Sequence, residues 1–399
     1  MRIAFLTNYF PKLSETFIMN QVIGLLERGH DVQVFALEPP DEELTHEAVE
    51  AYNLQERTTY FSQPKDYFSG AVTVARLAAK YPHTIPQIPT ALRRGREGGV
   101  RLSVLYQFKK RTEWDFDVYH AHFGQVGKRW DFLPEEVDAP YIVSFYGHDA
   151  SKELSADAKS YQQTFSVADA ITVLSEDMRD DVTNAGCARE KTVIQPLPVD
   201  LEQFTYSPTT YSEGDGVQLL TVARFTEKKG LDDALDAVNG VADEYDVRWT
   251  IAGDGPLRDA FEEEVHNRDL EDTIEVLGWV TQERVHELLN QSHLFLLPSK
   301  TSEAGDKEGT PTVLLEAQAS GVPVLSTRHA GIPEIVVDGE TGILVSEDDA
   351  VELMEALKRF LDTPGMWVEM GRQGRSFIEE THSKSAVAAK LENLYEGKT

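Results

Sequence analysis

The sequence predicts an α/β protein built from two doubly wound, Rossmann-like parallel-sheet domains that face a central cleft. Three observations lead to this prediction. Short apolar segments alternate with amphipathic ones along the 399 residues, as is typical of strands joined by helices in a parallel sheet. A stretch rich in Pro, Gly and Ser at 195–215 separates two such series. Polar motifs follow several strands, at the carboxyl ends where α/β sheets bind ligands.

The first series begins with apolar strands at 2–7 and 32–37, which bracket an amphipathic helix near 16–28. Gly29 provides the C-terminal stop of that helix. These elements open a first domain, which we expect to span residues 1–200. Its further strands are expected at 117–121, 141–145, 171–174 and 192–195.

The second series begins at Val217 and predicts a second domain over residues 201–375. A helical segment over 366–396 closes the chain, and we expect 376–399 to cross back to the first domain. The strands of this series are expected at 217–222, 247–252, 274–277, 293–297, 323–326 and 342–345, and its helices near 231–243, 256–267, 282–290, 311–320 and 349–362.

The composition indicates a globular chain, with 41% hydrophobic residues. Cys187 is the single cysteine, so no intramolecular disulfide can form, which fits a reducing cytoplasm. The opening apolar run is too short for a signal peptide. No run approaches the ~18 apolar residues of a transmembrane helix. The sequence therefore predicts a cytoplasmic protein that is soluble or peripheral to a membrane.

The formal net charge is -30, from 68 acidic and 38 basic residues. Such a charge opposes general nucleic-acid binding. The acidic residues are scattered over the whole chain rather than confined to a tail. An acidic, lysine-poor surface suggests a salt-adapted organism, such as a haloarchaeon, and an ordinarily acidic bacterial enzyme is the alternative.

The stretch 67–112 is basic within this acidic chain. It carries nine Lys or Arg and one acid, Glu97, with apolar residues between them. Such a region predicts a surface for anionic lipid or for a phosphorylated acceptor, on the inner face of the cell membrane. The alternative is a basic helical pair that balances nearby acid. The cations are Arg76, Lys80, Arg93, Arg94, Arg96, Arg101, Lys109, Lys110 and Arg111.

The segment 303–334 contains a polar loop, a helix start, a carboxylate inside the helix and a buried strand. Thr310 is expected to be the N-cap, with Pro311 at the first helical position. The free amides and the positive dipole end of that helix can hold an anion such as phosphate. Glu308 precedes this anion site and Glu316 lies two turns inside the helix. Two carboxylates around a phosphate pocket suit a ligand with one diphosphate and hydroxyls on either side, such as a nucleotide sugar.

Two further motifs follow strands of the second domain. Arg224 and Lys229, with Gly230 before a helix, can clamp a diphosphate, and a solvated charged loop is the alternative. Gly253 and Gly255 resemble part of a dinucleotide fingerprint but lack its third glycine. They can form a tight turn that lets a nucleotide approach. The first turn of the N-terminal domain has no glycine, which argues against a nicotinamide dehydrogenase.

His120 and His122 end a strand of the first domain. They share one face of that strand, but no Asp or Glu is spaced to complete a zinc site. We therefore expect His122 to reach a substrate hydroxyl and His120 to be a buried, hydrogen-bonded histidine. Asp115 and Asp117 form an Asp-x-Asp pattern, but they lie at the amino end of the same strand, away from the predicted cleft.

The segment Tyr146-Gly-His148-Asp149 ends the next strand and is expected to face the cleft, unless it is only a polar turn. We assign Tyr146, His148 and Asp149 to the acceptor side. The first turn of the domain, Ser14-Glu15-Thr16, is assigned to the same side.

The order of these motifs resembles glycosyltransferase family 4, and the match covers nearly the whole chain. The segments that carry it are Ser14-Glu-Thr-Phe-Ile, His120-Ala-His-Phe-Gly, Gly147-His-Asp149, Ala223-Arg-Phe-Thr-Glu-Lys-Lys-Gly230, Gly253-Asp-Gly-Pro-Leu257 and Glu308-Gly-Thr-Pro to Gly331-Ile-Pro-Glu334. The Ser14 segment resembles a branch that acts in cell-surface polysaccharide and colanic-acid-like synthesis. The resemblance implies the GT-B fold. The sequence departs from the family in its first loop, where Ser14-Glu15-Thr16 replaces glycines, and at Tyr146, where many members have His.

The resemblance also implies an activity, which is retaining transfer of a sugar from a nucleotide-sugar donor, UDP- or GDP-linked, without a metal or other cofactor. The acceptor would be lipid-linked or a polysaccharide. The first domain would bind the acceptor and the second the donor. Arg224 and Lys229 would neutralise the donor diphosphate, and His122 would lie near the reacting sugar.

The resemblance implies further donor contacts. Glu316 would bind the ribose hydroxyls and Glu308 the donor sugar, while Gly309 and Thr310 would offer amides. A nucleotide-sugar 2-epimerase of the same fold and a non-catalytic nucleotide-sugar-binding protein are the rival interpretations. The sugar, the base and the acceptor are not indicated by the sequence.

Overall fold

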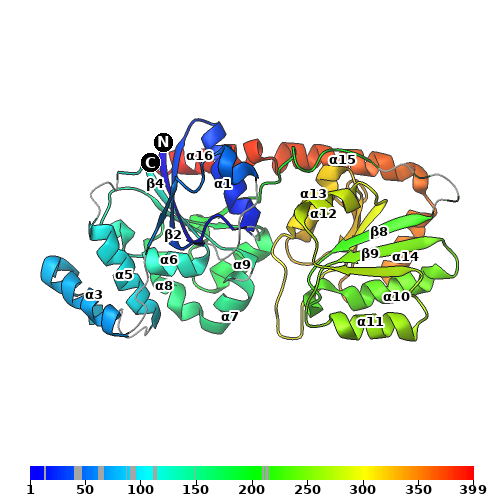
Figure 1. Ribbon diagram of the computed structural model, residues 1–399, viewed down its shortest axis with the longest axis horizontal. Helices are drawn as coiled ribbons and strands as arrows, with labels where there is room; N and C mark the ends of the chain where they lie inside the picture. Colours follow the sequence, from blue (N-terminus) through cyan, green and yellow to red (C-terminus); the bar gives the residue numbers. More distant parts are fainter. Residues whose placement is uncertain are drawn as a thin grey trace. The chain divides into compact units, whose positions relative to one another are not determined.

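The computed structural model describes residues 1–12, 15–39, 47–61, 67–86, 88–89, 96–110, 115–147, 149–208, 211, 214 and 216–399. Contacts divide the chain into two compact units, which are described separately (Figure 1). Unit 1 comprises Met1–Val173, Arg179–Gln195 and Ala388–Thr399. Unit 2 comprises Leu174–Met178 and Pro196–Val387.

Within the described residues, unit 1 has a seven-stranded parallel sheet in the order β3-β2-β1-β4-β5-β6-β7. The order reverses direction beside β1, which is the arrangement of a doubly wound sheet. The strands are β1 (Arg2–Tyr9), β2 (Asp31–Glu38), β3 (Thr58–Tyr60), β4 (Val118–His122), β5 (Tyr141–Ser144), β6 (Ala170–Val173) and β7 (Thr192–Ile194).

Helices pack on this sheet through apolar residues at helical spacing. In α1, Ile18, Val22 and Leu25 are buried, and they share one core with Leu391 and Tyr395 of α16. The helices of the N-terminal series and the last helix are α1 (Thr16–Glu27), α2 (Glu47–Ala51), α3 (Tyr67–Lys80), α5 (Arg96–Lys110), α6 (Gly124–Trp130), α7 (Leu154–Asp157), α8 (Gln162–Val167), α9 (Glu176–Asn184) and α16 (Lys384–Glu396).

Unit 2 is built on a six-stranded parallel sheet, counted over its described residues, in the order β10-β9-β8-β11-β12-β13. The strand order of this sheet also reverses, between β8 and β11. Open α/β sheets bind ligands at the carboxyl ends of the two strands that flank such a reversal. The strands are β8 (Val217–Val222), β9 (Val247–Ala252), β10 (Ile274–Gly278), β11 (Leu294–Leu297), β12 (Val324–Thr327) and β13 (Gly342–Val345).

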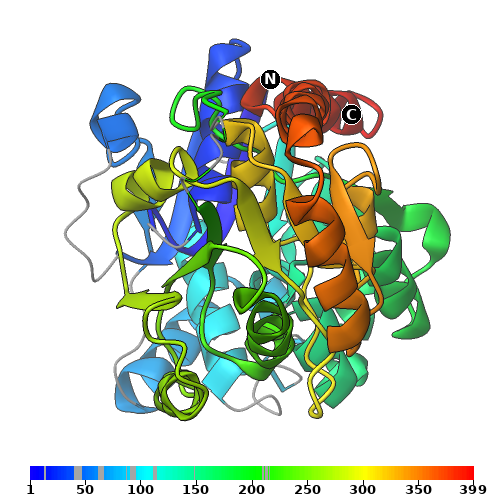
Figure 2. The same ribbon diagram turned by 90° about the vertical axis from the view of Figure 1, so that its right-hand side faces the viewer.

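Two helix layers enclose this second sheet (Figures 1 and 2). One layer contains α10 (Leu231–Ala242), α11 (Arg258–Asn267) and α14 (Ala350–Leu361), and the other contains α12 (Gln282–Leu289), α13 (Thr312–Ser320) and α15 (Trp367–Thr381). The core includes Phe225, Trp249 and Phe261, which meet edge to face. Asp349 caps α14, because its carboxylate accepts from the Glu352 amide.

The prediction of two doubly wound, parallel-sheet α/β domains is confirmed, and each predicted strand lies within two residues of an observed one. The sequence analysis did not expect β3, whose three residues are too few to show a period. The closing helical segment is two helices and not one. The helix is interrupted at His382 and Ser383, where Ser383 pairs with Val199 in an isolated β-bridge.

Candidate functional site

Three cations gather in the segment that follows β8 in unit 2. Arg224 is exposed, and its guanidinium has no ion-pair partner among the described residues. Lys228 and Lys229 lie in the short helix Glu227–Lys229, which ends at Gly230. The strand-end position that the sequence predicted for Arg224 and Lys229 is therefore observed.

Lys229 pairs directly with Glu308, with 2.8 Å between Nζ and Oε1. Both side chains are mostly buried, at 14% and 10% exposed. Lys228 adds a contact to Asp306 at 3.2 Å and lies 4.0 Å from Glu308. Burial opposes the ionisation of Glu308, but the two lysines hold the pKa of its carboxyl below the ordinary value. The result is a charged cluster that joins the loops after β8 and β11.

The start of α13 differs from the prediction. Pro311, not Thr310, occupies the N-cap position, and the helix begins at Thr312. Pro311 has the extended ψ of 113° that a capping residue needs. The Thr310 hydroxyl therefore caps nothing, and it is buried without a hydrogen-bond partner among the described residues. The buried Oγ of Ser299, after β11, is likewise unpartnered. Buried polar atoms without hydrogen-bond partners are rare in native folds, so these two hydroxyl groups are candidates to bind a polar group.

Glu316 lies inside α13 and its side chain is buried. Burial raises the pKa of its carboxyl to about 7. Its one hydrogen bond to a described side chain comes from Gln282 Nε2 at 3.5 Å, the outer limit for such a bond. This carboxylate can accept further hydrogen bonds.

Gly253 and Gly255 bring the loops after β8 and β9 into backbone contact. A Cβ on Gly253 would lie 1.8 Å from the carbonyl oxygen of Ala223, and one on Gly255 2.6 Å from that of Phe225. Side chains at these two positions would push the segment that carries Arg224 away from the loop after β9. The tight-turn interpretation of these glycines therefore describes their local role.

His120 is fully buried in unit 1, and both of its ring nitrogens have partners. Nδ1 lies 2.6 Å from the Tyr395 hydroxyl, and Nε2 lies 2.7 Å from the Ser144 hydroxyl. Burial lowers the pKa of the ring to about 3, so His120 is neutral. The expectation of a buried, hydrogen-bonded histidine is met.

His122 is also fully buried, and its Nδ1 lies 2.8 Å from the Tyr146 hydroxyl. Its Nε2 has no hydrogen-bond partner among the described residues. Burial and the neighbouring His120 ring, stacked at 4.4 Å between centroids, hold the pKa of His122 well below its usual value. His122 can therefore act as a neutral hydrogen-bonding group and not as a cationic acid.

The remaining acceptor-side residues are placed as follows. Asp149 is buried and accepts from the Gly124 and Tyr146 amides at 3.1 and 3.2 Å. Burial raises the pKa of this carboxyl to about 7. Glu15 pairs with Lys12 at 2.6 Å, and Thr16 begins α1. Ser14 and His148 lie outside the described residues.

Asp115 and Asp117 lie at the amino end of β4, as expected. Asp117 accepts from the Arg2 amide at 2.6 Å, and Asp115 pairs with the Arg2 guanidinium at 3.6 Å. Their contacts tie β4 to the start of β1. Over the described ranges, no group of three His, Cys, Asp or Glu side chains could hold a metal ion.

Part of the basic stretch 67–112 forms internal ion pairs. The buried Arg101 pairs with Asp131 at 2.7 Å, and Lys109 pairs with Glu136. Arg76 and Lys80 on α3 are exposed, whereas Arg93, Arg94 and Arg111 lie outside the described residues. For Arg101 and Lys109 the alternative prediction, basic helices that balance nearby acid, is therefore correct.

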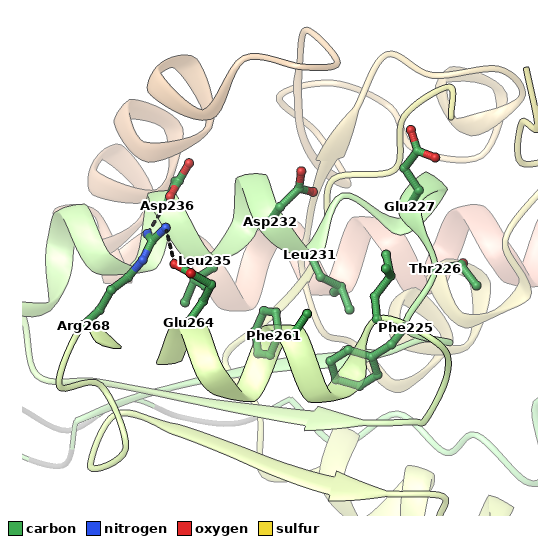
Figure 3. A pocket seen from close by; sticks show the side chains of 12 residues that line it. Phe225, Thr226, Glu227, Leu231, Asp232, Leu235, Asp236, Phe261, Glu264 and Arg268 are labelled. Atoms are coloured by element: carbon green, nitrogen blue, oxygen red, sulfur yellow. Dashed lines mark hydrogen bonds and ion pairs between the residues drawn. The ribbon is translucent and has the colours of Figure 1, made fainter. Parts of the chain in front are cut away.

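A pocket of about 300 Å³ lies between α10 and α11 (Figure 3). Its walls are largely apolar, with Phe225 and Phe261, and at one end Arg268 pairs with Asp236 and Glu264. Of the described residues that line it, none was predicted to bind a donor. An apolar groove with an acidic rim does not suit a diphosphate, so this pocket is separate from the charged cluster.

Sequence reasoning missed Lys228, which shares the Glu308 carboxylate, and His329, which bonds to the Glu308 amide. His329 follows β12, so the strand-end rule could have identified it. It also missed Tyr395, the partner of His120, for which the sequence gives no local signal. In the part of the chain that the structure describes, no helix has both the length and the apolar character needed to cross a membrane.

Comparisons with known proteins show the family of the chain. Residues 14–203 match the model of Glycosyltransferase Family 4, and residues 205–377 match that of Glycosyl transferases group 1. The chain is 32% identical over 409 residues to the putative colanic acid biosynthesis glycosyltransferase WcaL of Escherichia coli, covering 99% of both chains. It is 29% identical over 405 residues to the amylovoran biosynthesis glycosyltransferase AmsK of Erwinia amylovora, again covering 99% of both. The chain belongs to glycosyltransferase family 4.

A solved structure is similar over the full length. The structure of Anabaena HepE in complex with UDP matches with a TM-score of 0.72 at 15% identity, covering 100% of both chains. This likeness shows the fold, which is GT-B. The protein is thus a glycosyltransferase with two Rossmann-like units.

Proposed function

We propose that this glycosyltransferase moves a sugar, with retention of configuration, from a UDP- or GDP-linked donor to a lipid-linked or polysaccharide acceptor in cell-surface polysaccharide synthesis. The observation that carries the proposal is the charged cluster in unit 2, where Arg224 has no ion-pair partner among the described residues and Lys229 meets Glu308. The biosynthetic roles that the names of WcaL and AmsK state, and the UDP bound by HepE, support the polymer and the donor class.

In this proposal unit 2 holds the donor. Arg224 and Lys229 neutralise the diphosphate, and the amides of Gly309 and Thr310, in the segment just before α13, add hydrogen bonds. The unpartnered, buried Thr310 hydroxyl supports a polar ligand there. The buried Glu316 carboxylate accepts from the ribose hydroxyls, and Glu308 contacts the sugar, while Gly253 and Gly255 keep the Arg224 loop in place.

The proposed chemistry stabilises the leaving diphosphate. As the bond from the anomeric carbon to the phosphate oxygen breaks, negative charge grows on that oxygen, beside two fixed cations and the backbone amides that precede α13. The leaving oxygen then takes the proton of the attacking acceptor hydroxyl, which bonds to the same face of the sugar. No nucleophilic carboxylate on the opposite face is needed, in contrast to a double-displacement glycosidase.

The proposal places the acceptor in the N-terminal domain, residues 1–200, and the donor in residues 201–375, with 376–399 returning to the N-terminal domain. His122 supplies a neutral hydrogen bond to the reacting sugar through Nε2. The unpartnered state of that buried nitrogen supports this role. Glu15, Thr16 and Tyr146 remain candidates for binding the acceptor. Asp149 accepts hydrogen bonds from two backbone amides, which favours a role in positioning the loop.

Metal independence is part of the proposal. Lys228, Lys229 and Arg224 provide the positive charge that a divalent ion provides in other transferases. Activity should therefore survive excess EDTA at wild-type levels. Loss of activity in EDTA with recovery on adding Mn²⁺ or Mg²⁺ would contradict this part.

We also propose that the basic stretch 67–112 contacts an anionic membrane surface from the cytoplasmic side. The exposed Arg76 and Lys80 support this, since each cation near such a surface adds about 1 kcal/mol. The double variant R76S/K80S should co-sediment less with phosphatidylglycerol vesicles at low salt and should still hydrolyse donor. Lys358→Ser, a surface cation of unit 2 paired with Glu244, is the matched control. Equal sedimentation of all three proteins would contradict membrane contact.

The function is tested by incubating the protein with a panel of UDP- and GDP-hexoses and short polyprenyl-phosphate or polyprenyl-diphosphate-linked acceptors. Transfer with retained anomeric configuration, read by mass spectrometry and NMR, is the expected result. Conversion of the donor to its 2-epimer without an acceptor would favour the epimerase. Donor binding without any turnover would favour a binding protein.

A further inference from the structure

His329 forms a buried hydrogen-bonded link beside the proposed donor site. It follows β12 and is 1% exposed. Its Nε2 accepts from the Glu308 amide at 3.0 Å. A backbone amide can only donate, so Nε2 must carry the lone pair and Nδ1 the proton. That proton is directed at Glu347 Oε2, 2.8 Å away. The tautomer of His329 is therefore fixed by its neighbours.

Glu347 connects this histidine to a third loop. The same Oε2 atom accepts from the Thr301 amide at 2.8 Å and from the Thr301 hydroxyl at 3.2 Å. Burial opposes the ionisation of Glu347, but these bonds and the one from His329 hold the pKa of its carboxyl below the ordinary value. One carboxylate thus ties together the segments that follow β11, β12 and β13.

The His329 segment meets the Glu308 segment at a second point. A Cβ on Gly331 would lie 2.8 Å from the carbonyl oxygen of Gly309, so only a glycine allows this approach. Ala330, between them, has a φ of 45°, which is rare outside glycine. The backbone at 308–309 is therefore fixed both by a hydrogen bond and by close packing.

The Glu308 side chain depends on that backbone. Its carboxylate meets Lys229 at 2.8 Å, and its own amide is the one that His329 holds. We propose that His329, oriented by Glu347, is a positioning residue that sets Glu308, Gly309 and Thr310 against the donor sugar and diphosphate. The inference rests on the proposed function of that segment. His329 acts through Glu308 and needs no contact with the substrate.

Two substitutions separate this role from a general structural one. His329→Asn places its amide nitrogen near the position of Nδ1, so it keeps the donor to Glu347 and loses the acceptor for the Glu308 amide. His329→Gln extends to the position of Nε2 and keeps that acceptor. We expect H329N to lower kcat about tenfold, since small displacements of catalytic groups are costly, and H329Q to recover most of it. Glu347→Ala is also expected to lower kcat, but by less than H329N does.

The second readout is amide hydrogen exchange of the Glu308 segment, which needs no activity. We expect faster exchange at Glu308 in H329N and slow exchange in H329Q and wild type, with thermal midpoints of the three proteins alike. Wild-type kcat and exchange in H329N would overturn the proposal, and so would equal losses in both variants. If the wild type transfers no sugar, the proposed function fails, while the exchange measurement still tests the positioning role.

Discussion

The buried histidines at the end of β4 in unit 1 are neutral, whereas Lys229 and Glu308, in the segments after β8 and β11 of unit 2, form a charged pair. In unit 1, burial lowers the pKa values of His120 and His122, and hydroxyl groups are their hydrogen-bond partners. In unit 2, Lys229 and Glu308 are mostly buried and form an ion pair, and the lysine holds the pKa of the Glu308 carboxyl below its ordinary value. Fixed charge suits a departing diphosphate, and neutral donors suit sugar hydroxyls. The comparison therefore predicts which half each kind of substitution will affect.

The largest effect is expected from Lys229→Ala. It removes one cation from the proposed diphosphate site and leaves Glu308 with a buried charge that has lost its closest partner. Turnover should fall about 100-fold, as for the loss of one transition-state donor, measured as nucleoside diphosphate released from a saturating donor. Lys358→Ala removes a surface cation from the same unit and should keep its rate. Near-wild-type turnover in K229A would contradict the proposal that the fixed charge of unit 2 stabilises the leaving diphosphate.

A smaller effect is expected at Glu316, where pH is the variable. The folded-state pKa of about 7 lies above the ordinary 4.5. Ribose hydroxyls donate to the ionised form, so the affinity for a UDP- or GDP-hexose should increase from pH 6 to pH 8. Glu316→Gln should bind roughly tenfold more weakly at pH 8, for the loss of a charged acceptor, with little dependence on pH. A wild-type affinity that is flat over this range would contradict the assignment.

The raised pKa of Glu316 also predicts that the ionised carboxylate, which favours donor binding, destabilises the protein when no donor is bound. Because the pKa of Glu316 is raised on folding, its contribution to stability is present below about pH 4.5 and is lost as pH rises through about 7. Glu316→Gln should therefore unfold at a higher temperature than wild type at pH 8 without donor. A lower thermal midpoint of E316Q at pH 8 would show that the carboxylate is stabilised by an interaction in the fold.

Tyr146→Phe should have a moderate effect. It removes the hydroxyl 2.8 Å from His122 Nδ1, so the ring loses the partner that holds its tautomer. Turnover should fall about fivefold, for one neutral hydrogen bond, while nucleoside diphosphate affinity is unchanged. Tyr141→Phe is the control, because its buried hydroxyl donates to the Gly127 carbonyl in the same unit. A loss of diphosphate affinity in Y146F would contradict the assignment of diphosphate binding to unit 2 alone.

The smallest catalytic effect is expected from Tyr395→Phe. It leaves His120 Nδ1 without the hydroxyl at 2.6 Å, and the free energy of unfolding should fall by about 1 kcal/mol. Turnover should stay within about twofold of wild type, because His120 contributes packing and not a free donor. Denaturant titration and steady-state rates measure the two quantities. A large loss of turnover at unchanged stability would give His120 a direct role.

The sequence could predict what strand ends bring together, because parallel strands place their carboxyl ends along one edge of a sheet. That rule correctly put Lys229 and Glu308 in one unit on neighbouring loops. It could not show that they pair directly, which depends on side-chain geometry. The partner of His120, Tyr395, is 275 residues away, so no local pattern reveals it. Thr310 was wrongly expected as the N-cap because the sequence alone does not show whether Pro311 opens the helix or precedes it.

The central claim is that the charged cluster of unit 2, and not the neutral network of unit 1, binds the donor diphosphate. Calorimetric titration of UDP and GDP into wild type, R224A/K229A and H122N/Y146F tests it most directly. We expect the nucleotide that wild type binds more tightly to bind R224A/K229A at least about 100-fold more weakly, because two charged contacts are lost, and to bind H122N/Y146F as it binds wild type. Equal affinity for R224A/K229A and wild type, or a loss confined to H122N/Y146F, would contradict it.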